Sequence, residues 1–275
     1  MDYLKKTLDY LFLYGKGKRF FLLWLFFLPT CLLVGLFFPT SKYVDILFSF
    51  RTATYPSFSA FWLNSFNSAW WALVGLAIAF VLFLLSVSYV SAIITRHIRI
   101  GKLAFPNFFR AVNNNFFPAM AVTAFFLLVA FVAHLVFIGL AYLWMQLASR
   151  VLGLVMTILF LILILIGMTY LLSSTTMWLP TMSFSGQYVF RALGVAFYKS
   201  RNYQRKFFVS ALFAVAAVTV VAVAGHFCPV WYVTAILHAL IYSVVLTVTV
   251  AFSFITYCES ESIKREDLAQ KYFGR

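Results

Sequence analysis

The sequence predicts an all-α, polytopic membrane protein, and three observations carry that prediction. Apolar residues make up 64% of the chain and charged residues 10%, with a mean hydropathy of +0.96, whereas soluble domains have about 45–50% apolar and about 25% charged residues. Apolar runs of about 20 residues, long enough to cross a bilayer, recur along the chain. The hydrophobicity comes in blocks and lacks the alternation of a transmembrane barrel, so we expect these runs to be helices.

We predict six spans, of which the first is retained. The apolar run that follows the basic N-terminal residues is too long for a signal core, and no small-x-small cleavage site follows it. The third and fourth spans are separated by a short polar break at Gln146, Ser149 and Arg150. The predicted spans are residues 20–38, 69–94, 117–143, 152–178, 207–224 and 232–257, within a single transmembrane domain, residues 1–258, that precedes a short charged tail, residues 259–275.

The basic residues predict the orientation. Eighteen of the 21 Lys and Arg residues fall on one side of this alternation, and Lys42, Arg51 and Arg150 fall on the other. Because cytoplasmic loops of membrane proteins carry the excess of Lys and Arg, both termini and the tail are expected in the cytoplasm.

The acidic residues are confined to the two ends of the sequence. No aspartate or glutamate lies between Ile46 and Cys258. The hydrophobic body therefore lacks a carboxylate to act as general base, metal ligand or cation-coupling site, which argues against most enzymes and most ion-driven transporters. No cofactor motif is present, and the cysteines do not suggest a disulfide framework.

Three segments on the predicted cytoplasmic side have the spacing of amphipathic helices that lie in the membrane interface. The first is an elbow helix near the N-terminus, with Leu4, Leu8, Leu11 and Phe12 on one stripe. The second precedes span three, with Phe105, Phe108, Phe109, Val112 and Phe116 on one stripe and Pro106 in its first turn. The third precedes span five, with a stripe of Val189, Leu193 and Phe197.

The second and third of these segments share a short similar sequence, which we call the echo. Phe-Phe-Arg-Ala-Val at 108–112 is followed 81 residues later by Val-Phe-Arg-Ala-Leu at 189–193. One interpretation is an internal duplication of a span–interfacial helix–span unit, as found in transport-type folds. The other is chance similarity in an apolar chain.

The basic connections are the main candidates for function. Each Lys or Arg at an anionic leaflet adds about 1 kcal/mol of attraction, although much of this charge also fixes the topology. The basic residues lie close to the membrane, so nucleic acid is not an expected partner. The candidates for binding lipid headgroups or another anion are Arg96, Arg99, Lys102, Arg110, Arg191, Lys199, Arg201, Arg205 and Lys206.

Polar residues inside the spans are the second set of candidates. An ionisable group in a membrane is a functional candidate by default, yet histidines and hydroxyls also hold helices together by hydrogen bonds. The intramembrane candidates are His134, His238, Ser173, Ser174, Thr175 and Thr176. His226, Cys228 and His238 lie near one another in sequence, but no fourth ligand accompanies them and no metal site is predicted.

The connection between spans one and two, residues 39–68, is rich in aromatic residues. Aromatic side chains favour the headgroup level, so we expect an interfacial anchor, with a lid or a partner surface as the alternative. Pro56 is a suitable start for a helix lying on the outer surface.

The segment RIGKLAFPNFFRAVNNNF, from Arg99 to Phe116, resembles the basic, Phe-Arg-Ala and Asn-Phe pattern of the YesL-like and YciC-like bacterial integral membrane families. The resemblance is clearest over residues 89–208, and the aromatic outer connection departs from YesL-like chains. It implies a protein of the bacterial cytoplasmic membrane and transfers no catalytic residue.

Two classes of function follow from these observations. The first is a non-enzymatic plasma-membrane protein that acts as an accessory, scaffold or lipid-interacting subunit of a larger assembly. The alternative is a transport permease for an amphiphilic or anionic substrate, one version of which is an exporter subunit coupled to a separate ATPase. A membrane-embedded enzyme would need an unusual site based on His134 or His238.

Overall fold

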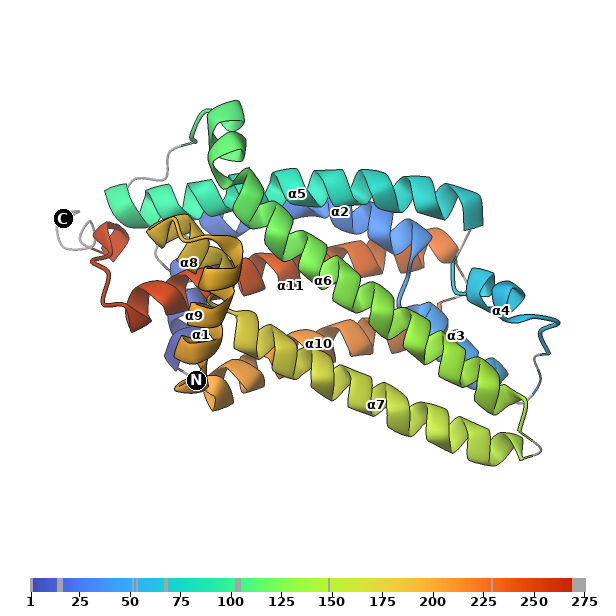
Figure 1. Ribbon diagram of the computed structural model, residues 1–275. Helices are drawn as coiled ribbons and strands as arrows, with labels where there is room; N and C mark the ends of the chain where they lie inside the picture. Colours follow the sequence, from blue (N-terminus) through green and yellow to red (C-terminus); the bar gives the residue numbers. More distant parts are fainter. Residues whose placement is uncertain are drawn as a thin grey trace.

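The computed structural model describes residues 2–13, 17–50, 52, 54–66, 69–101, 105–147, 149–228 and 230–268, which form helices joined by short connections (Figure 1). In chain order the helices are α1 (Asp2–Leu8), η1 (Asp9–Leu13, a π-helix), α2 (Lys18–Phe37), α3 (Ser41–Ser49), α4 (Phe58–Asn64), α5 (Ala69–Ile100), α6 (Phe108–Met145), α7 (Arg150–Thr175), α8 (Trp178–Ser185), α9 (Val189–Arg201), α10 (Gln204–His226) and α11 (Trp231–Ser260).

Among the described residues, six helices, α2, α5, α6, α7, α10 and α11, are long and apolar enough to cross a membrane, which confirms the prediction of six long apolar helices. At a rise of 1.5 Å per residue, α2 is about 30 Å long and α6 about 57 Å, compared with a hydrocarbon layer about 30 Å thick. Each predicted span overlaps one of these helices along most of its length, and the longer helices extend beyond it.

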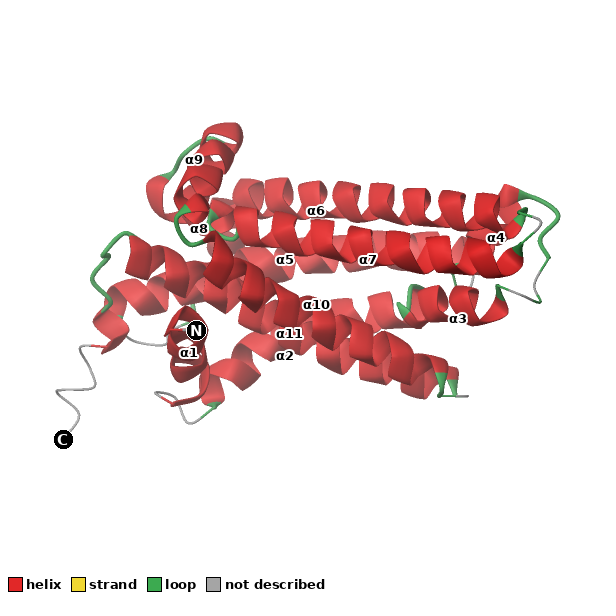
Figure 2. Ribbon diagram, turned by 90° about the horizontal axis from the view of Figure 1, so that it is seen from below, coloured by secondary structure: helices red, strands yellow, loops and turns green. Residues whose placement is uncertain are grey.

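The two ends of the bundle differ. Helices α1, α8 and α9 lie at one end together with the C-terminal part of α11, and α3 and α4 lie at the other (Figures 1 and 2). We call these the terminal end and the loop end. Figure 2 shows α2, α10 and α11 diverging from α6 and α7 toward the loop end, where α3 lies between α10 and α7 and contacts both.

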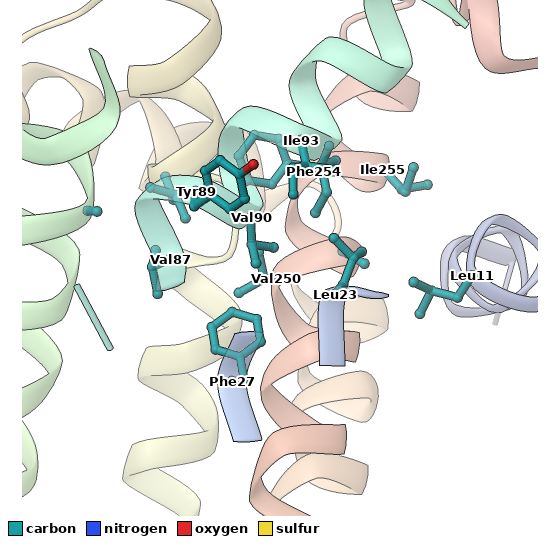
Figure 3. Packing of buried hydrophobic residues seen from close by; sticks show 14 of the residues in the cluster. Leu11, Leu23, Phe27, Val87, Tyr89, Val90, Ile93, Val250, Phe254 and Ile255 are labelled. Carbon is teal, nitrogen blue, oxygen red and sulfur yellow. The ribbon is translucent and has the colours of Figure 1, made fainter. Parts of the chain in front are cut away.

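The main hydrophobic core joins α2, α5 and α11. Leu23 and Phe27 of α2, Val90 and Ile93 of α5, and Phe254 of α11 are buried against one another (Figure 3). Half of the apolar window of α11 is buried in the protein, compared with 11% of that of α7. In a membrane α11 is therefore the central helix, and α7 presents most of its surface to the surroundings.

The aromatic connection at the loop end contributes side chains to the protein core, and its expected role as an interfacial anchor stays a prediction. It forms α3 and α4, and Ile46 of α3, Phe50 directly after α3 and Phe61 of α4 are buried with Phe137 and Ile138 of α6 in a separate core cluster. A helix does begin soon after Pro56, with the Ser57 side chain as N-cap. The large aromatic side chains therefore fill the space between diverging helices, which the sequence alone does not show.

The segment before span three is not a separate helix. It is the first part of α6, which is capped by Asn107, so Pro106 precedes the helix and does not lie in its first turn. Proline inside a helix removes a hydrogen bond and favours a kink. α6 contains Pro118, and Figure 1 shows its first turns set at an angle to the rest.

The elbow segment is helical, as α1 and η1, but its buried side chains are Thr7, Tyr10 and Leu11. Of the predicted apolar stripe, Leu8 and Phe12 are exposed. The positive φ of 77° at Gly17 then allows the chain to turn into α2.

The helix boundaries repeat at the spacing of the sequence echo. α6 begins at Phe108 and α9 at Val189, while α6 ends at Met145 and α10 at His226. Both pairs are 81 residues apart, and the same interval separates the starts of α5, α7 and α11 at Ala69, Arg150 and Trp231. α9 followed by α10 thus corresponds to α6, with the helix bent near Pro118 in one copy and interrupted after Arg201 in the other. This agreement favours the duplication over chance.

Candidate functional site

Two equivalent surfaces at the terminal end combine exposed aromatic side chains with an arginine. The α6 face consists of Phe109, Arg110 and Phe117, whose aromatic side chains are 82% and 69% exposed. The α9 face consists of the corresponding Phe190, Arg191 and Tyr198, with aromatic exposures of 86% and 77%.

Small buried residues hold each face in place. Ala111 and Ala119 of α6 are buried, and so are their counterparts Ala192 and Ser200 of α9. Short side chains let a helix approach its neighbours closely. The two similar segments therefore share a burial pattern as well as residue types. In both, the alanine faces the protein interior and the Phe-Arg pair faces outward.

The α9 face differs from the predicted stripe of Val189, Leu193 and Phe197. Val189 and Leu193 are partly buried against Trp178 and Phe207, and the Trp178 indole donates a hydrogen bond of 3.0 Å to the Val189 carbonyl. Only Phe197 of that stripe is exposed. The aromatic residues that project from the protein are those next to the stripe.

The predicted basic candidates separate into two groups, and Lys102 lies outside the described residues. Lys199 forms an ion pair of 2.6 Å with Glu261, whereas Arg99 and Lys206 lie over the rings of Phe184 and Tyr3. The remaining five are exposed and form no ion pair with any described residue: Arg96, Arg110, Arg191, Arg201 and Arg205.

The acidic residues of the tail do not neutralise these arginines, because they are used elsewhere. Arg265 bridges Glu259 at 3.2 Å and Asp267 at 2.9 Å, and Lys6 of α1 also pairs with Glu259. We call these four residues the ionic clasp. It ties the tail to the N-terminal helix, and both partners of its inner pair are buried, with side-chain exposures of 5% for Arg265 and 0% for Asp267.

The ionic clasp packs against Tyr10. Arg265 lies over the Tyr10 ring, and the Tyr10 hydroxyl is 3.1 Å from Nδ1 of His97 at the end of α5. Burial raises the pKa of the Tyr10 hydroxyl, and the charge of Asp267 raises it further. Burial alone would lower the pKa of Arg265, but the hydrogen bonds and charges of Asp267 and Glu259 raise it above its usual value.

His134 lies in a structural contact between three helices. Its Nδ1 is 2.9 Å from the Tyr43 hydroxyl of α3, and its Nε2 is 3.2 Å from Oγ of Ser65, which follows α4. The Ser65 hydroxyl also lies 2.6 Å from the Trp62 carbonyl, to which it donates. Phe38 and Phe66 pack around the imidazole. This arrangement favours a helix-joining role over a reactive one.

His238 is fully buried where α2, α10 and α11 meet. Its Nδ1 is 2.7 Å from the Thr234 carbonyl of its own helix, while its Nε2 has no hydrogen-bond partner among the described residues. Gly35 and Gly225 are in close contact with it, and neither leaves space for a Cβ atom.

The hydroxyl run at the end of α7 joins that helix to the α9–α10 corner. The Gln204 amide donates to Oγ of Ser173 at 2.7 Å and of Ser174 at 3.2 Å, and Ser200 donates to the Ser174 carbonyl at 2.8 Å. Thr175 and Thr176 donate to carbonyls of their own helix. These bonds support the packing interpretation for all four residues.

The loop end contains one side-chain contact between distant helices that the sequence pattern does not predict. His226 at the end of α10 lies 2.7 Å from the Asp45 carboxylate of α3 and stacks on Phe48. His226 and Asp45 are 181 residues apart, and the only hint in the sequence is that Asp45 is the single acid of that region. Among the described residues, no three His, Cys, Asp or Glu side chains gather as they would around a metal ion.

Two hollows are found at the loop end. One is a pit of about 60 Å³ beside the α6–α7 turn, and the other is an open apolar groove of about 520 Å³ along α6. The pit is lined partly by polar side chains, and the groove is almost entirely apolar.

Comparison with family models, curated proteins and solved structures finds no match for this chain. The resemblance to YesL-like and YciC-like proteins therefore stays a prediction.

Proposed function

We propose that this multi-pass protein resides in the bacterial plasma membrane with both termini in the cytoplasm, and that it is a non-enzymatic accessory or scaffold subunit which binds anionic lipid headgroups. The observation that carries the proposal is the pair of equivalent aromatic–arginine faces on α6 and α9. It refines the predicted set of nine basic residues to the arginines that are exposed and unpaired among the described residues.

Charge and shape support a lipid ligand. With 18 basic residues on its side of the chain, the terminal end fits the cytoplasmic leaflet, where the anionic lipids are. Exposed Phe and Tyr side chains next to arginine are typical of helices that lie at the headgroup boundary, with the rings inserted and the guanidinium group at phosphate level.

The duplication strengthens this interpretation. Packing explains why alanine recurs at 111 and 192, because both residues are buried. It does not explain why a phenylalanine and an arginine recur at 109–110 and 190–191, since these side chains point away from the protein. A shared ligand on the outer side of both helices accounts for the recurrence.

The test is lipid selectivity. The full chain is reconstituted in nanodiscs that contain phosphatidylcholine and a spin-labelled phosphatidylglycerol or phosphatidylcholine, and the immobilised fraction of each labelled lipid is measured. We expect wild type to prefer phosphatidylglycerol. We expect the combined R110Q, R191Q, R201Q and R205Q variant to lose most of that preference, at about 1 kcal/mol or about five-fold for each arginine at most.

The matched control is Lys264→Gln. Lys264 is at the same end and its side chain is 84% exposed, but it is paired with Glu266, so its removal is expected to leave the preference unchanged. Equal preferences in wild type and the combined variant would refute lipid binding by these faces. The accessory role is tested separately, by identifying stoichiometric membrane proteins that co-purify with wild type.

A further inference from the structure

The two hollows at the loop end share one lining residue. Tyr142 of α6 lines both the polar pit and the apolar groove. The pit lies beside the turn from α6 to α7, and the groove lies between α4 and α6, which are neighbours in Figure 2. A single ligand can therefore occupy both hollows if one part of it is polar and the adjoining part is apolar.

The pit is lined by hydrogen-bond donors. Tyr55, Gln146 and Arg150 contribute a hydroxyl, an amide and a guanidinium group, and no carboxylate is among the lining residues. The Tyr55 hydroxyl already accepts a hydrogen bond of 2.9 Å from Asn64, so its own hydrogen is available to donate. Asp45 is the acid of the described loop end, and it is paired with His226. Donors with one cation and no acid are complementary to a phosphate group.

The groove has the chemistry and the depth of an acyl-chain site. Its lining consists of Phe58, Val136, Gly139, Leu140, Tyr142 and Leu143. Gly139 lies six residues before the end of α6 and Val136 nine, which places them about 9 Å and about 14 Å below the pit along the helix. Half of a hydrocarbon layer is about 15 Å thick, so the groove extends through the acyl region of one leaflet.

We propose that the pit and groove together bind one phospholipid of the leaflet at the loop end, with its phosphate in the pit and one acyl chain over Gly139. This site is independent of the proposed faces on α6 and α9, which lie at the terminal end. It provides this bundle with a specific lipid position in the leaflet opposite the basic end.

The experiment uses the full chain in nanodiscs containing a trace of phosphatidylglycerol or phosphatidylcholine with a diazirine in the acyl chain. After illumination, the labelled residues are mapped by peptide mass spectrometry, which separates this site from any lipid at the terminal end. We expect labelling to concentrate on residues 136–143 and to be stronger for phosphatidylglycerol. We also expect unlabelled phosphatidylglycerol to compete better than phosphatidylcholine.

Two variants test the parts of the site. Gly139→Leu fills the groove, and it should not disturb the fold because a Cβ at Gly139 meets nothing within 4 Å. The matched control is Gly167→Leu on α7, where a Cβ also meets nothing within 4 Å. We expect G139L to lose the labelling at 136–143 and G167L to keep it. R150Q should reduce phosphatidylglycerol labelling by about five-fold, toward the phosphatidylcholine level.

Three results would overturn the proposal. Labelling of 136–143 that is no stronger than that of the exposed residues of α7 would identify ordinary boundary lipid. Unchanged labelling in G139L would show that the chain does not lie over Gly139. A change of oligomeric state in G139L, measured by light scattering, would show that the groove receives a second copy of the chain.

Discussion

At the scale of single residues, glycines decide how closely the helices around His238 approach. A Cβ at Gly35 would lie 2.6 Å from the Ala235 carbonyl oxygen, and a Cβ at Gly225 would lie 2.7 Å from Cε1 of His238. Small residues at helix contacts are the usual means by which membrane helices pack tightly. The buried imidazole therefore depends on two glycines from two other helices.

We predict that Gly35→Ala and Gly225→Ala destabilise the protein by about 1–3 kcal/mol, the usual range for overpacking. The loss should be greater at Gly35, since the clash there is with backbone and not with a side chain. The measurement is the thermal unfolding midpoint in detergent. Gly167→Ala is the control and should leave the midpoint unchanged or raise it, because alanine favours helix. Equal midpoints for all three variants would contradict the close packing.

The second residue-scale prediction concerns His134. If its role is to join helices, Tyr43→Phe and His134→Ala should be coupled in stability, because they remove the same 2.9 Å hydrogen bond. We expect a coupling energy of about 0.6 kcal/mol, the average for hydrogen bonds between membrane helices. A double-mutant cycle from unfolding measurements gives this value. Additive effects would show that the bond does not stabilise the bundle.

At the scale of elements, α6 and α9 show what the sequence predicts well. Apolar length predicts six crossing helices, and the Phe-Arg-Ala echo indicates two related segments. Periodicity assigns the apolar side of α9 to Val189, Leu193 and Phe197. The structure instead buries Ala192, Ala196 and Ser200, because small residues define the contact surface of a closely packed helix. A hydrophobic stripe is therefore a poor guide to which side faces the protein.

The element-scale prediction tests which side faces the lipid. Spin labels are placed one at a time at positions 109, 111, 190 and 192 in a Cys228→Ser background, since Cys31 and Cys258 are buried. We expect labels at 109 and 190 to be relaxed by oxygen, which partitions into lipid, and labels at 111 and 192 to be immobile and shielded. If a water-soluble nickel complex relaxed the labels at 109 and 190 instead, the faces would point to solvent or a soluble partner.

At the scale of the whole molecule, the sequence does not reveal which residues far apart in the chain are in contact. The Asp45–His226 pair, the filling of the loop end by Phe50 and Phe61, and the pit beside Arg150 all depend on how α3 and α4 fold back between diverging helices. No local pattern encodes that path. The ionic clasp is similar, because Lys6 and Glu259 come together only when the first and last helices are neighbours.

The clasp is expected to hold the terminal end together. Arg265→Gln leaves Asp267 buried without its cation, and breaking a buried pair in this way costs about 3–5 kcal/mol. We expect a lower unfolding midpoint and faster removal of the tail by a protease. Lys264→Gln, which breaks an exposed pair with Glu266, should leave the unfolding midpoint nearly unchanged.

The double variant Arg265→Gln, Asp267→Asn separates charge from shape. It removes both charges and leaves side chains of similar size, so part of the lost stability should return if the cost comes from an unpaired buried carboxylate. A double variant no more stable than R265Q would mean that the guanidinium acts through its contacts with Glu259 and the Tyr10 ring. If R265Q were as stable and as protease-resistant as wild type, the tail would not be held by the clasp at all.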